Sequence, residues 1–170
     1  LGVMGVDPGE EVMQAIAHTA RRMDFHGRWE MLRRRPDMLC DIGHNPPALA
    51  RNFAQLEEYL AQGRYDRLVV VYGVMADKDL DGIIPLMPRK AVWIAVAPDT
   101  PRSMKAEILF ERLRANLPGE VLFGGSVADG LALALDLARS GSADNTLIYI
   151  GGSTFVVSEA VAALQDGSAE

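Results

Sequence analysis

Several short segments of the sequence combine residue types that bind anions or move protons. Residues 41–46 read Asp-Ile-Gly-His-Asn-Pro and bring a carboxylate (Asp41), an imidazole (His44) and an amide (Asn45) within five positions of each other. With a glycine to bend the chain, such groups can converge on one ligand at the amino terminus of a helix. The alternative is that Asp41 or Asn45 only caps the helix and that His44 is a surface residue. Both interpretations stay open from these residues alone.

A second segment, residues 151–154, reads Gly-Gly-Ser-Thr. Glycines such as Gly152 let the backbone approach a ligand closely, and exposed amides together with the Ser153 hydroxyl can form a cradle for a carboxylate or a phosphate. The same turn also has the composition of an ordinary helix cap, so the pattern supports both roles equally.

Two more segments carry charged side chains. Residues 73–79 read Gly-Val-Met-Ala-Asp-Lys-Asp, in which Lys78 can reach a phosphate or a carboxylate, whereas Asp79 is suited to capping the next helix. Taken alone, this segment favours capping. In residues 98–103, Arg102 could bind a carboxylate, although a solvated loop arginine is the commoner case.

The elements that must position these segments alternate along the chain. Continuous β-branched runs such as residues 68–73 are typical of strands buried on both faces of a parallel sheet. Strands are predicted over residues 28–32, 38–41, 68–73, 92–96, 121–123 and 146–150, the first two as a hairpin. Helices are predicted over residues 10–23, 46–63, 80–87, 103–117, 127–140 and 154–164, followed by a frayed tail over 165–170.

This alternation predicts an α/β domain of Rossmann-like architecture, with a mostly parallel sheet covered by helices on both faces. In such sheets ligands bind outside the carboxyl ends of the strands, where the four segments are expected to lie. Residues 1–26 stand apart from the pattern and are interpreted as a terminal helix and linker from a preceding domain. The α/β domain is expected to span residues 27–170.

Composition excludes several classes of function. The chain of 170 residues has 17 basic and 23 acidic side chains, so its net charge of −6 does not favour binding to nucleic acid or to an anionic membrane. A single cysteine, Cys40, favours a reducing compartment, and we expect a cytoplasmic protein. The sequence contains no apolar run long enough to span a membrane. It also lacks the dinucleotide-binding, P-loop, zincin and nucleophile-elbow motifs.

Taken together, the segments resemble a known family. Residues 27–30 (Gly-Arg-Trp-Glu), 41–46, 73–79 and 151–160 resemble, in order, motifs in the carboxyl-terminal domain of folylpolyglutamate synthase/dihydrofolate synthase. These enzymes are ATP-dependent amide ligases similar to the Mur ligases. The resemblance implies a reaction in which ATP phosphorylates a carboxylate of a folate or of dihydropteroate. The amine of L-glutamate then attacks the acyl phosphate.

The resemblance also implies roles for individual residues. Arg28 would contact the phosphates of ATP and Asp41 its ribose or adenine side. His44 would be catalytic at the junction of ATP and glutamate, and Ser153 would bind the glutamate. Accessory candidates are Asn45, Lys78, Asp79, Gly152 and Arg102.

The sequence departs from the family at two positions of these motifs. The family usually has Asp-Gly-Ala-His-Asn where this chain has Ile42-Gly43 in the middle, which moves the flexible position by one. Phe155 stands where a tyrosine is often found, so a hydroxyl that could aid glutamate binding is missing.

The family's P-loop and its Mg²⁺ ligands belong to an amino-terminal ATPase domain that these residues do not include. We therefore expect no metal site in this chain, and no turnover by the chain alone. The alternative is a stand-alone Rossmann-like module that binds a carboxylated or phosphorylated metabolite without catalysis. Neither the choice between folate and dihydropteroate nor the oligomeric state can be predicted from these residues.

Overall fold

A computed structural model describes residues 27–141 and 145–167 of the chain. Its sheet contains six strands in the order β1-β2-β6-β3-β4-β5. β1 is antiparallel to β2, and all the other neighbours are parallel. The strands are β1 (Glu30–Arg33), β2 (Asp37–Asp41), β3 (Arg67–Tyr72), β4 (Val92–Ala97), β5 (Val121–Ser126) and β6 (Thr146–Gly151). The predicted hairpin and the mostly parallel sheet are thus confirmed.

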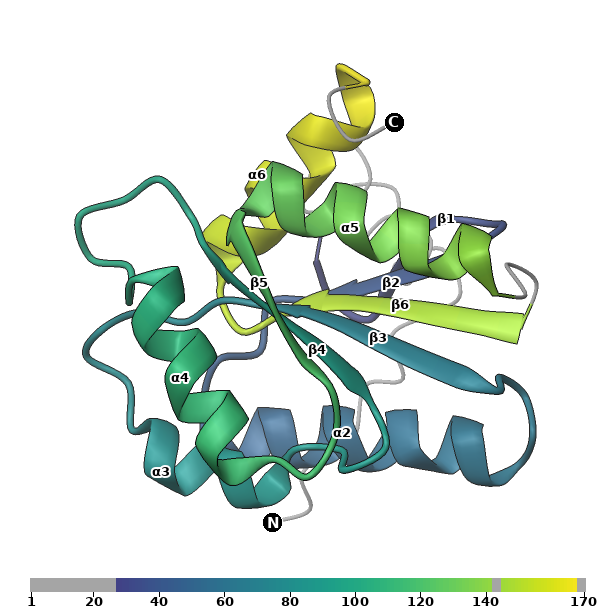
Figure 1. Cartoon of the computed structure of the whole chain (residues 1–170), viewed down its shortest axis with the longest axis horizontal. Coiled ribbons are helices and arrows are strands. Elements are labelled where there is room, and N and C mark those ends of the chain that lie inside the picture. The colour runs from purple at the N-terminus through teal and green to yellow at the C-terminus, as the bar shows by residue number, and fades with distance from the viewer. Residues whose placement is uncertain (1–26, 142–144, 168–170) are drawn as a thin grey trace, which may run out of the picture.

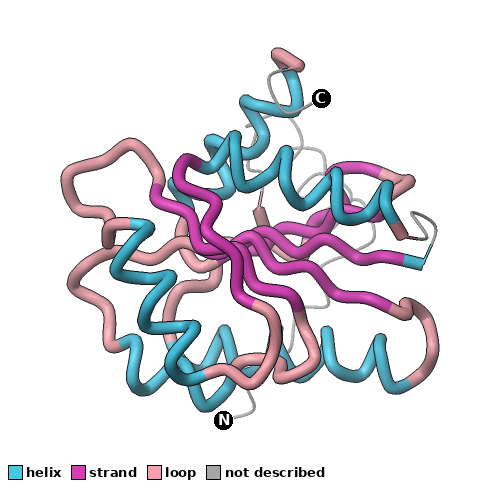
Figure 2. The backbone as a smooth tube through the Cα atoms, viewed as in Figure 1, coloured by secondary structure: helices cyan, strands magenta, loops and turns pink. Residues whose placement is uncertain are grey.

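Helices cover both faces of this sheet (Figure 1). They are α2 (Pro46–Ala61), α3 (Leu80–Ile83), the 3₁₀ helix η1 (Ile84–Leu86), α4 (Ala106–Asn116), α5 (Val127–Ser140) and α6 (Thr154–Gln165). The tube drawn in Figure 2 shows the strands as a central layer between them. The helix predicted over residues 10–23 and the proposed linker to residue 26 lie outside the described residues.

The two faces of the sheet have separate cores because alternate residues of each strand point to opposite sides. On one side, Val70, Tyr72 and Tyr149 pack with α2, α3 and α4. On the other side, Val71 and Ile150 pack with α5 and α6. All five of these side chains are fully buried, as expected for central parallel strands.

Several predicted boundaries were wrong, three of them for identifiable reasons. The helix expected over 80–87 is divided into α3 and η1, with Pro85, which has no backbone N–H, in the first turn of η1. The helix expected from residue 103 begins at Ala106, because Met104 N donates to the Val74 carbonyl at 2.9 Å instead. The strand expected over 121–123 continues to Ser126, and a register shift in its pairing with β4 accommodates the extra residues. Gln165, predicted as the first residue of a frayed tail, is instead the last residue of α6.

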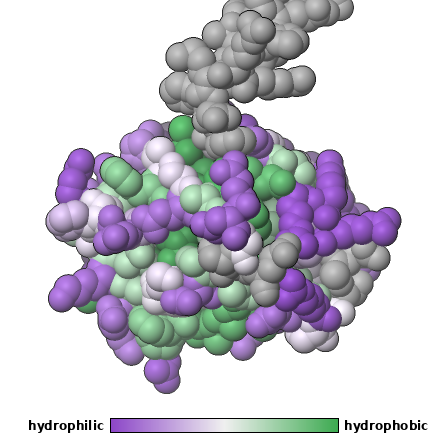
Figure 3. Space-filling model, turned by 90° about the horizontal axis from the view of Figure 1, so that it is seen from above, coloured by the Kyte–Doolittle hydropathy of each residue, from purple (hydrophilic) through white to green (hydrophobic). Residues whose placement is uncertain are grey.

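Figure 3 shows the surface from above, turned by 90° from Figure 1, and apolar side chains lie among hydrophilic ones on this face. Within the described residues the large apolar side chains that are exposed are Ile108, Phe123 and Phe155. They come from α4, β5 and α6, and scattered apolar residues of this kind are normal on a protein surface. No helix in the described ranges has the length and apolarity required to cross a bilayer.

Candidate functional site

The sheet register places the carboxyl ends of three strands at the same level. Gly151 at the end of β6 pairs with Asp41 at the end of β2 and with Tyr72 at the end of β3. The segments that begin at residues 41, 73 and 151 therefore start side by side. The Gly73 amide also donates to the Gly151 carbonyl at 3.3 Å. This arrangement confirms the expectation that these segments meet at one edge of the sheet.

The loop that follows β2 presents His44 to the surface. Asn45 caps α2, since its side-chain oxygen accepts a hydrogen bond from Ala48 N at 3.0 Å. His44 is exposed, and its Nδ1 lies 3.1 Å from the Ile42 carbonyl oxygen. Because a carbonyl can only accept, this contact favours the tautomer with the proton on Nδ1 and leaves Nε2 as an acceptor. The cap interpretation of Asn45 is thus confirmed, while His44 is available to a ligand.

Asp41 has a different environment from His44. Its side chain is 6% exposed, and Oδ1 accepts hydrogen bonds from Gly43 N at 2.7 Å and from Asn52 Nδ2 at 2.6 Å. Oδ2 accepts from Trp29 N at 2.9 Å. The carboxylate is therefore bonded to three parts of its own chain, and the contact with ribose or adenine stays a prediction.

Arg28 lies in a segment with unusual backbone geometry. Gly27 and Trp29 on either side of it have φ angles of +117° and +50°. The segment is tied to the loop after β2, because Ile42 N donates to the Gly27 carbonyl at 2.6 Å. Arg28 itself is exposed. A permanent cation is thus held beside the loop that carries His44, with its side chain accessible from outside.

Ser153 occupies the turn between β6 and α6 as a helix cap. Its hydroxyl accepts a hydrogen bond from Phe155 N at 3.2 Å, and the residue is only 3% exposed. Gly152 before it has φ +95°, and a Cβ at this position would overlap with the Gly73 carbonyl oxygen. The turn therefore requires glycine. The cap interpretation of Ser153 is confirmed, and its contact with glutamate stays a prediction.

The two remaining segments lie against each other. Ala76 N donates to the Arg102 carbonyl at 2.9 Å, which joins the loops after β3 and β4. Asp79 caps α3, as the pattern favoured, with its side chain accepting from Gly82 N at 3.1 Å. Lys78 Nζ is 3.9 Å from Asp77 Oδ2, and the Arg102 side chain is exposed. Their accessory roles are untested predictions.

Convergence of these side chains is limited. In the described part of the chain, the hydrogen bonds of the His44 and Ser153 side chains go to the backbone of Ile42 and Phe155, and no side-chain hydrogen bond joins Arg28, His44 or Ser153 to one another. The fold does bring together the backbone segments that carry these residues, because the carboxyl ends of β2 and β6 are paired. A ligand of some length would therefore be needed to touch all three.

Two polar residues of this region were not predicted from the sequence. Asn52 on α2 is 2% exposed, and its amide donates to Asp41 and, at 3.4 Å, to the Tyr149 hydroxyl. The available signal was its position three residues after Leu49 and four before Leu56, on the buried face of an amphipathic helix. Burial raises the pKa of the Tyr149 hydroxyl well above its ordinary value, and the nearby Asp41 charge adds to that shift.

Neither a metal site nor a reactive thiol is found here. Across residues 27–141 and 145–167, no group of three or more His, Cys, Asp or Glu side chains could hold a metal ion. Burial, aided by the charges of Glu30 and Asp41, raises the pKa of the Cys40 thiol to about 12. At neutral pH this buried cysteine is therefore a thiol and not a nucleophilic thiolate.

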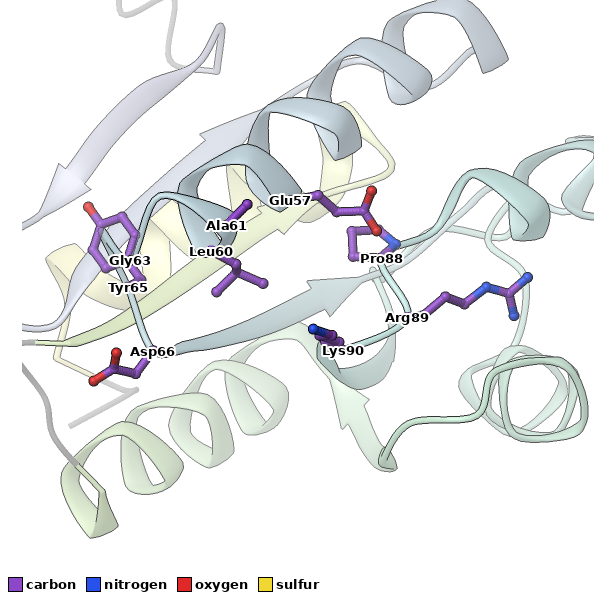
Figure 4. A pocket seen from close by; sticks show the side chains of 9 residues that line it. All are labelled: Glu57, Leu60, Ala61, Gly63, Tyr65, Asp66, Pro88, Arg89 and Lys90. Carbon is purple, nitrogen blue, oxygen red and sulfur yellow. The ribbon is translucent and has the colours of Figure 1, made fainter.

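A pocket of about 540 Å³ lies at the other end of the sheet, where β3 begins (Figure 4). It lies between the end of α2 and the segment before β4, and both acidic and basic side chains line it. Its lining residues are Glu57, Leu60, Ala61, Gly63, Tyr65, Asp66, Pro88, Arg89 and Lys90. None of the predicted site residues is among them, so the pocket is separate from the carboxyl edge.

Comparison with known proteins identifies the family. Residues 27–154 match the model of the Mur ligase glutamate ligase domain. The chain is 36% identical over 150 residues to a probable bifunctional folylpolyglutamate synthase/dihydropteroate synthase of Haloferax volcanii, covering 86% of this chain and 17% of that protein. It is 26% identical over 134 residues to the dihydrofolate synthase/folylpolyglutamate synthase of Escherichia coli, covering 77% of this chain and 28% of that protein.

Solved structures show the same fold. Folylpolyglutamate synthase of Mycobacterium tuberculosis, complexed with ADP and AMPPCP, is 28% identical with a TM-score of 0.64, over 83% of this chain and 32% of that one. FolC of E. coli, in complex with DHPP and ADP, is 21% identical with a TM-score of 0.69, over 96% and 36% of the two chains. The chain thus spans about a third or less of these relatives. It belongs to the Mur ligase glutamate ligase domain family, in the form found as the carboxyl-terminal domain of folylpolyglutamate synthases.

Proposed function

We propose that the chain is the carboxyl-terminal part of an ATP-dependent ligase that joins L-glutamate to a folate or to dihydropteroate through an acyl phosphate. The observation that carries this proposal is the pairing of the Arg28 segment with the His44 loop at the carboxyl edge of the sheet. An exposed guanidinium there suits a triphosphate, and an exposed imidazole with a free Nε2 acceptor suits the attacking amine. The family match covers the same region.

Each side chain has a task in this reaction that its environment supports. Arg28 would bind the phosphates of ATP, because it is accessible and always charged. His44 would act at the junction of ATP and glutamate, where its Nε2 can accept a hydrogen bond from the attacking amine or from a bound ligand.

Glutamate would bind near the start of α6. The first turn of this helix offers backbone N–H groups and the positive end of the helix dipole to a carboxylate. Ser153 is the residue that orients this turn, and its hydroxyl retains a proton to donate while it accepts from Phe155 N. Asn45, Lys78, Asp79, Gly152 and Arg102 would shape the surrounding loops.

Nucleotide and metal would be shared with another domain. Solved relatives were obtained with ADP and AMPPCP, and one from Yersinia pestis with AMPPNP and an Mn ion. The ligands for Mg²⁺ are proposed to lie on an amino-terminal P-loop domain of the same polypeptide, as the family resemblance implies. The greater length of the relatives supports this division, and the proposed boundary lies near residue 26.

The acceptor is proposed to be a pterin-containing carboxylic acid. The Haloferax relative is named for both folylpolyglutamate synthase and dihydropteroate synthase activities, and FolC of E. coli is complexed with DHPP. Both tetrahydrofolate and dihydropteroate must therefore be tested as acceptors. The composition of this chain fits the cytoplasm, where such an enzyme would meet ATP and glutamate.

The test begins with the reading frame upstream of Leu1. The complete polypeptide is expressed, and ADP release is measured with L-glutamate and each acceptor, with omission of either substrate as the blank. We expect ADP release that depends on both substrates, a loss of about 100-fold in Arg28→Ala, and normal activity in Arg139→Ala. Arg139 is a matched control, being an exposed arginine in the last turn of α5. Equal activity in the two variants would refute the assignment of Arg28, and no dependence on glutamate would refute the ligase.

A further inference from the structure

Asn52 connects three parts of the fold through one buried amide. It belongs to α2, and its Nδ2 donates to Asp41 Oδ1 at the end of β2 and to the hydroxyl of Tyr149 on β6. The side chain is 2% exposed, whereas asparagine is normally a surface residue. Burying a polar side chain in an otherwise apolar helix face requires a compensating contact. Asp41 supplies it, at 2.6 Å.

Asp41 depends on such donors, because its carboxylate is buried without an ion pair to Lys, Arg or His among the described residues. Its Oδ1 is fixed from two sides by Asn52 Nδ2 and by Gly43 N at 2.7 Å. Fixing Oδ1 also fixes Oδ2, since the carboxylate is planar. Oδ2 is the atom that accepts from Trp29 N at 2.9 Å.

Trp29 is the residue whose backbone needs that bond. With φ +50° it is in the left-handed region, which is unfavourable for a residue with a Cβ. Its indole packs beside Tyr149 and Tyr59, with ring centroids 6.2 and 6.3 Å apart. Strained conformations of this kind persist only where surrounding contacts hold them, and they concentrate at functional sites.

We propose that Asn52 is a positioning residue: its amide fixes the Asp41 carboxylate, which holds Trp29 in the left-handed conformation and thereby directs the Arg28 side chain and the loop that carries His44. The functional consequence rests on the proposed ligase function. The positioning itself does not, because it is a statement about the conformation of residues 27–44.

This proposal differs from a merely structural role in what a substitution changes. If Asn52 only filled space between α2 and the sheet, an apolar side chain of similar size would lower stability and leave the Trp29 segment in place. If Asn52 positions that segment, the same substitution releases Asp41 Oδ1 and alters the surroundings of Trp29 in the protein that remains folded.

The test uses the two tryptophans of the chain as internal probes. The protein is labelled with 5-fluorotryptophan, and the fluorine NMR signals of Trp29 and Trp93 are assigned with Trp29→Phe. Trp93 is fully buried on β4 and reports on the core. In Asn52→Leu we expect the Trp29 signal to shift or broaden and the Trp93 signal to stay in place. Exchange of the Trp29 amide proton should accelerate about tenfold or more.

Two further variants keep the result interpretable. Asn52→Ser removes the contact with Asp41 while retaining a small polar side chain, and it replaces Asn52→Leu if that protein does not fold. Thr146→Val is the matched control: Thr146 is 1% exposed and lies at the other end of β6. It should change stability without moving the Trp29 signal. An unchanged Trp29 signal and exchange rate in a folded Asn52 variant would overturn the proposal.

The functional arm is measured separately in the complete polypeptide. Asn52→Leu or Asn52→Ser should lower kcat/KM for ATP by about 10- to 100-fold when Arg28 is present. In a protein that already carries Arg28→Ala, the same Asn52 substitution should lower kcat/KM much less. A Trp29 effect without a kinetic effect would refute the role of the segment in ligation while leaving the positioning intact. A kinetic effect that persists in full in the Arg28→Ala background would refute action through Arg28.

Discussion

Tyr72→Phe should stabilise the protein. The Tyr72 side chain is fully buried, and its hydroxyl is the one buried side-chain polar atom in the described residues without a hydrogen-bond partner. An unpartnered buried polar group costs about 1–3 kcal/mol. The phenyl ring would keep its packing against Phe53 and Trp93, whose ring centroids lie 6.4 and 5.6 Å from that of Tyr72. We therefore expect a gain of about 1 kcal/mol after the loss of the oxygen's dispersion contacts.

The assay is urea denaturation of the 170-residue chain at pH 7, with tryptophan fluorescence as the signal. Tyr149→Phe is the matched control, because Tyr149 is equally buried but its hydroxyl accepts from Asn52 Nδ2 at 3.4 Å. Removing that hydroxyl should cost about 0.5–1.5 kcal/mol. A loss of more than about 1 kcal/mol in Tyr72→Phe, comparable to a bonded hydroxyl, would refute the reasoning and reveal a hydrogen-bond partner for this atom.

The same pair makes an alkaline prediction. Burial raises the pKa of Tyr72 and of Tyr149 well above the ordinary tyrosine value of about 10. Above pH 10 the unfolded chain releases these protons and the folded chain retains them, so stability falls as pH rises, by about 1.4 kcal/mol per pH unit for each tyrosine. Tyr72→Phe removes one of the two, so its advantage over the wild type should grow between pH 10 and 11 and be constant below pH 9.

Three other substitutions or reactions separate folding from function. His44→Ala, at an exposed position, should change stability by less than about 0.5 kcal/mol and abolish ADP release by the complete polypeptide; near-normal turnover would refute its catalytic assignment. Val70→Asp should prevent folding, because it places an unpaired carboxylate at a fully buried site on β3, and circular dichroism of a soluble, folded variant would contradict this. Cys40, whose thiol pKa is raised by burial to about 12, should react with a thiol reagent at pH 8 only as fast as the chain opens, so that urea accelerates labelling; rapid labelling of the native protein would contradict it.

Local patterns in the sequence were sufficient for the elements of the fold. The run of β-branched residues in β3 and the proline-to-glycine boundaries of α2 each favour one structure by themselves. The order of strands in the sheet could not be predicted from local patterns in this way, because β6 is the last strand in the chain yet pairs with β2 and β3. That pairing is set by burial of whole strands against one another, and no local spacing encodes it.

Candidate site residues could be selected from the sequence where their chemistry and position distinguish them. Arg28 and His44 are exposed in the structure, and their roles in binding and catalysis stay predictions. Asn52 escaped prediction because its importance comes from a contact with Asp41 across 11 positions of sequence and a change of element. The left-handed Trp29 was equally hidden, since its conformation depends on the same carboxylate and not on its own residue type.

Helix capping determines whether a substitution of a candidate residue changes activity alone or changes stability as well. Asn45, Asp79 and Ser153 each accept a hydrogen bond from the first turn of a helix, and removing such a cap costs about 0.5–2 kcal/mol of stability. A loss of activity in Ser153→Ala would therefore combine a weakened α6 with any lost contact to glutamate. Arg28 and His44 cap none of the described helices, so we expect their substitution to impair the proposed ligation with little effect on folding. A nucleotide that protects the wild-type chain from unfolding, but does not protect Arg28→Ala, would therefore show that its phosphates bind at Arg28. Such a result is more direct than a loss of activity in a variant of Asn45, Asp79 or Ser153.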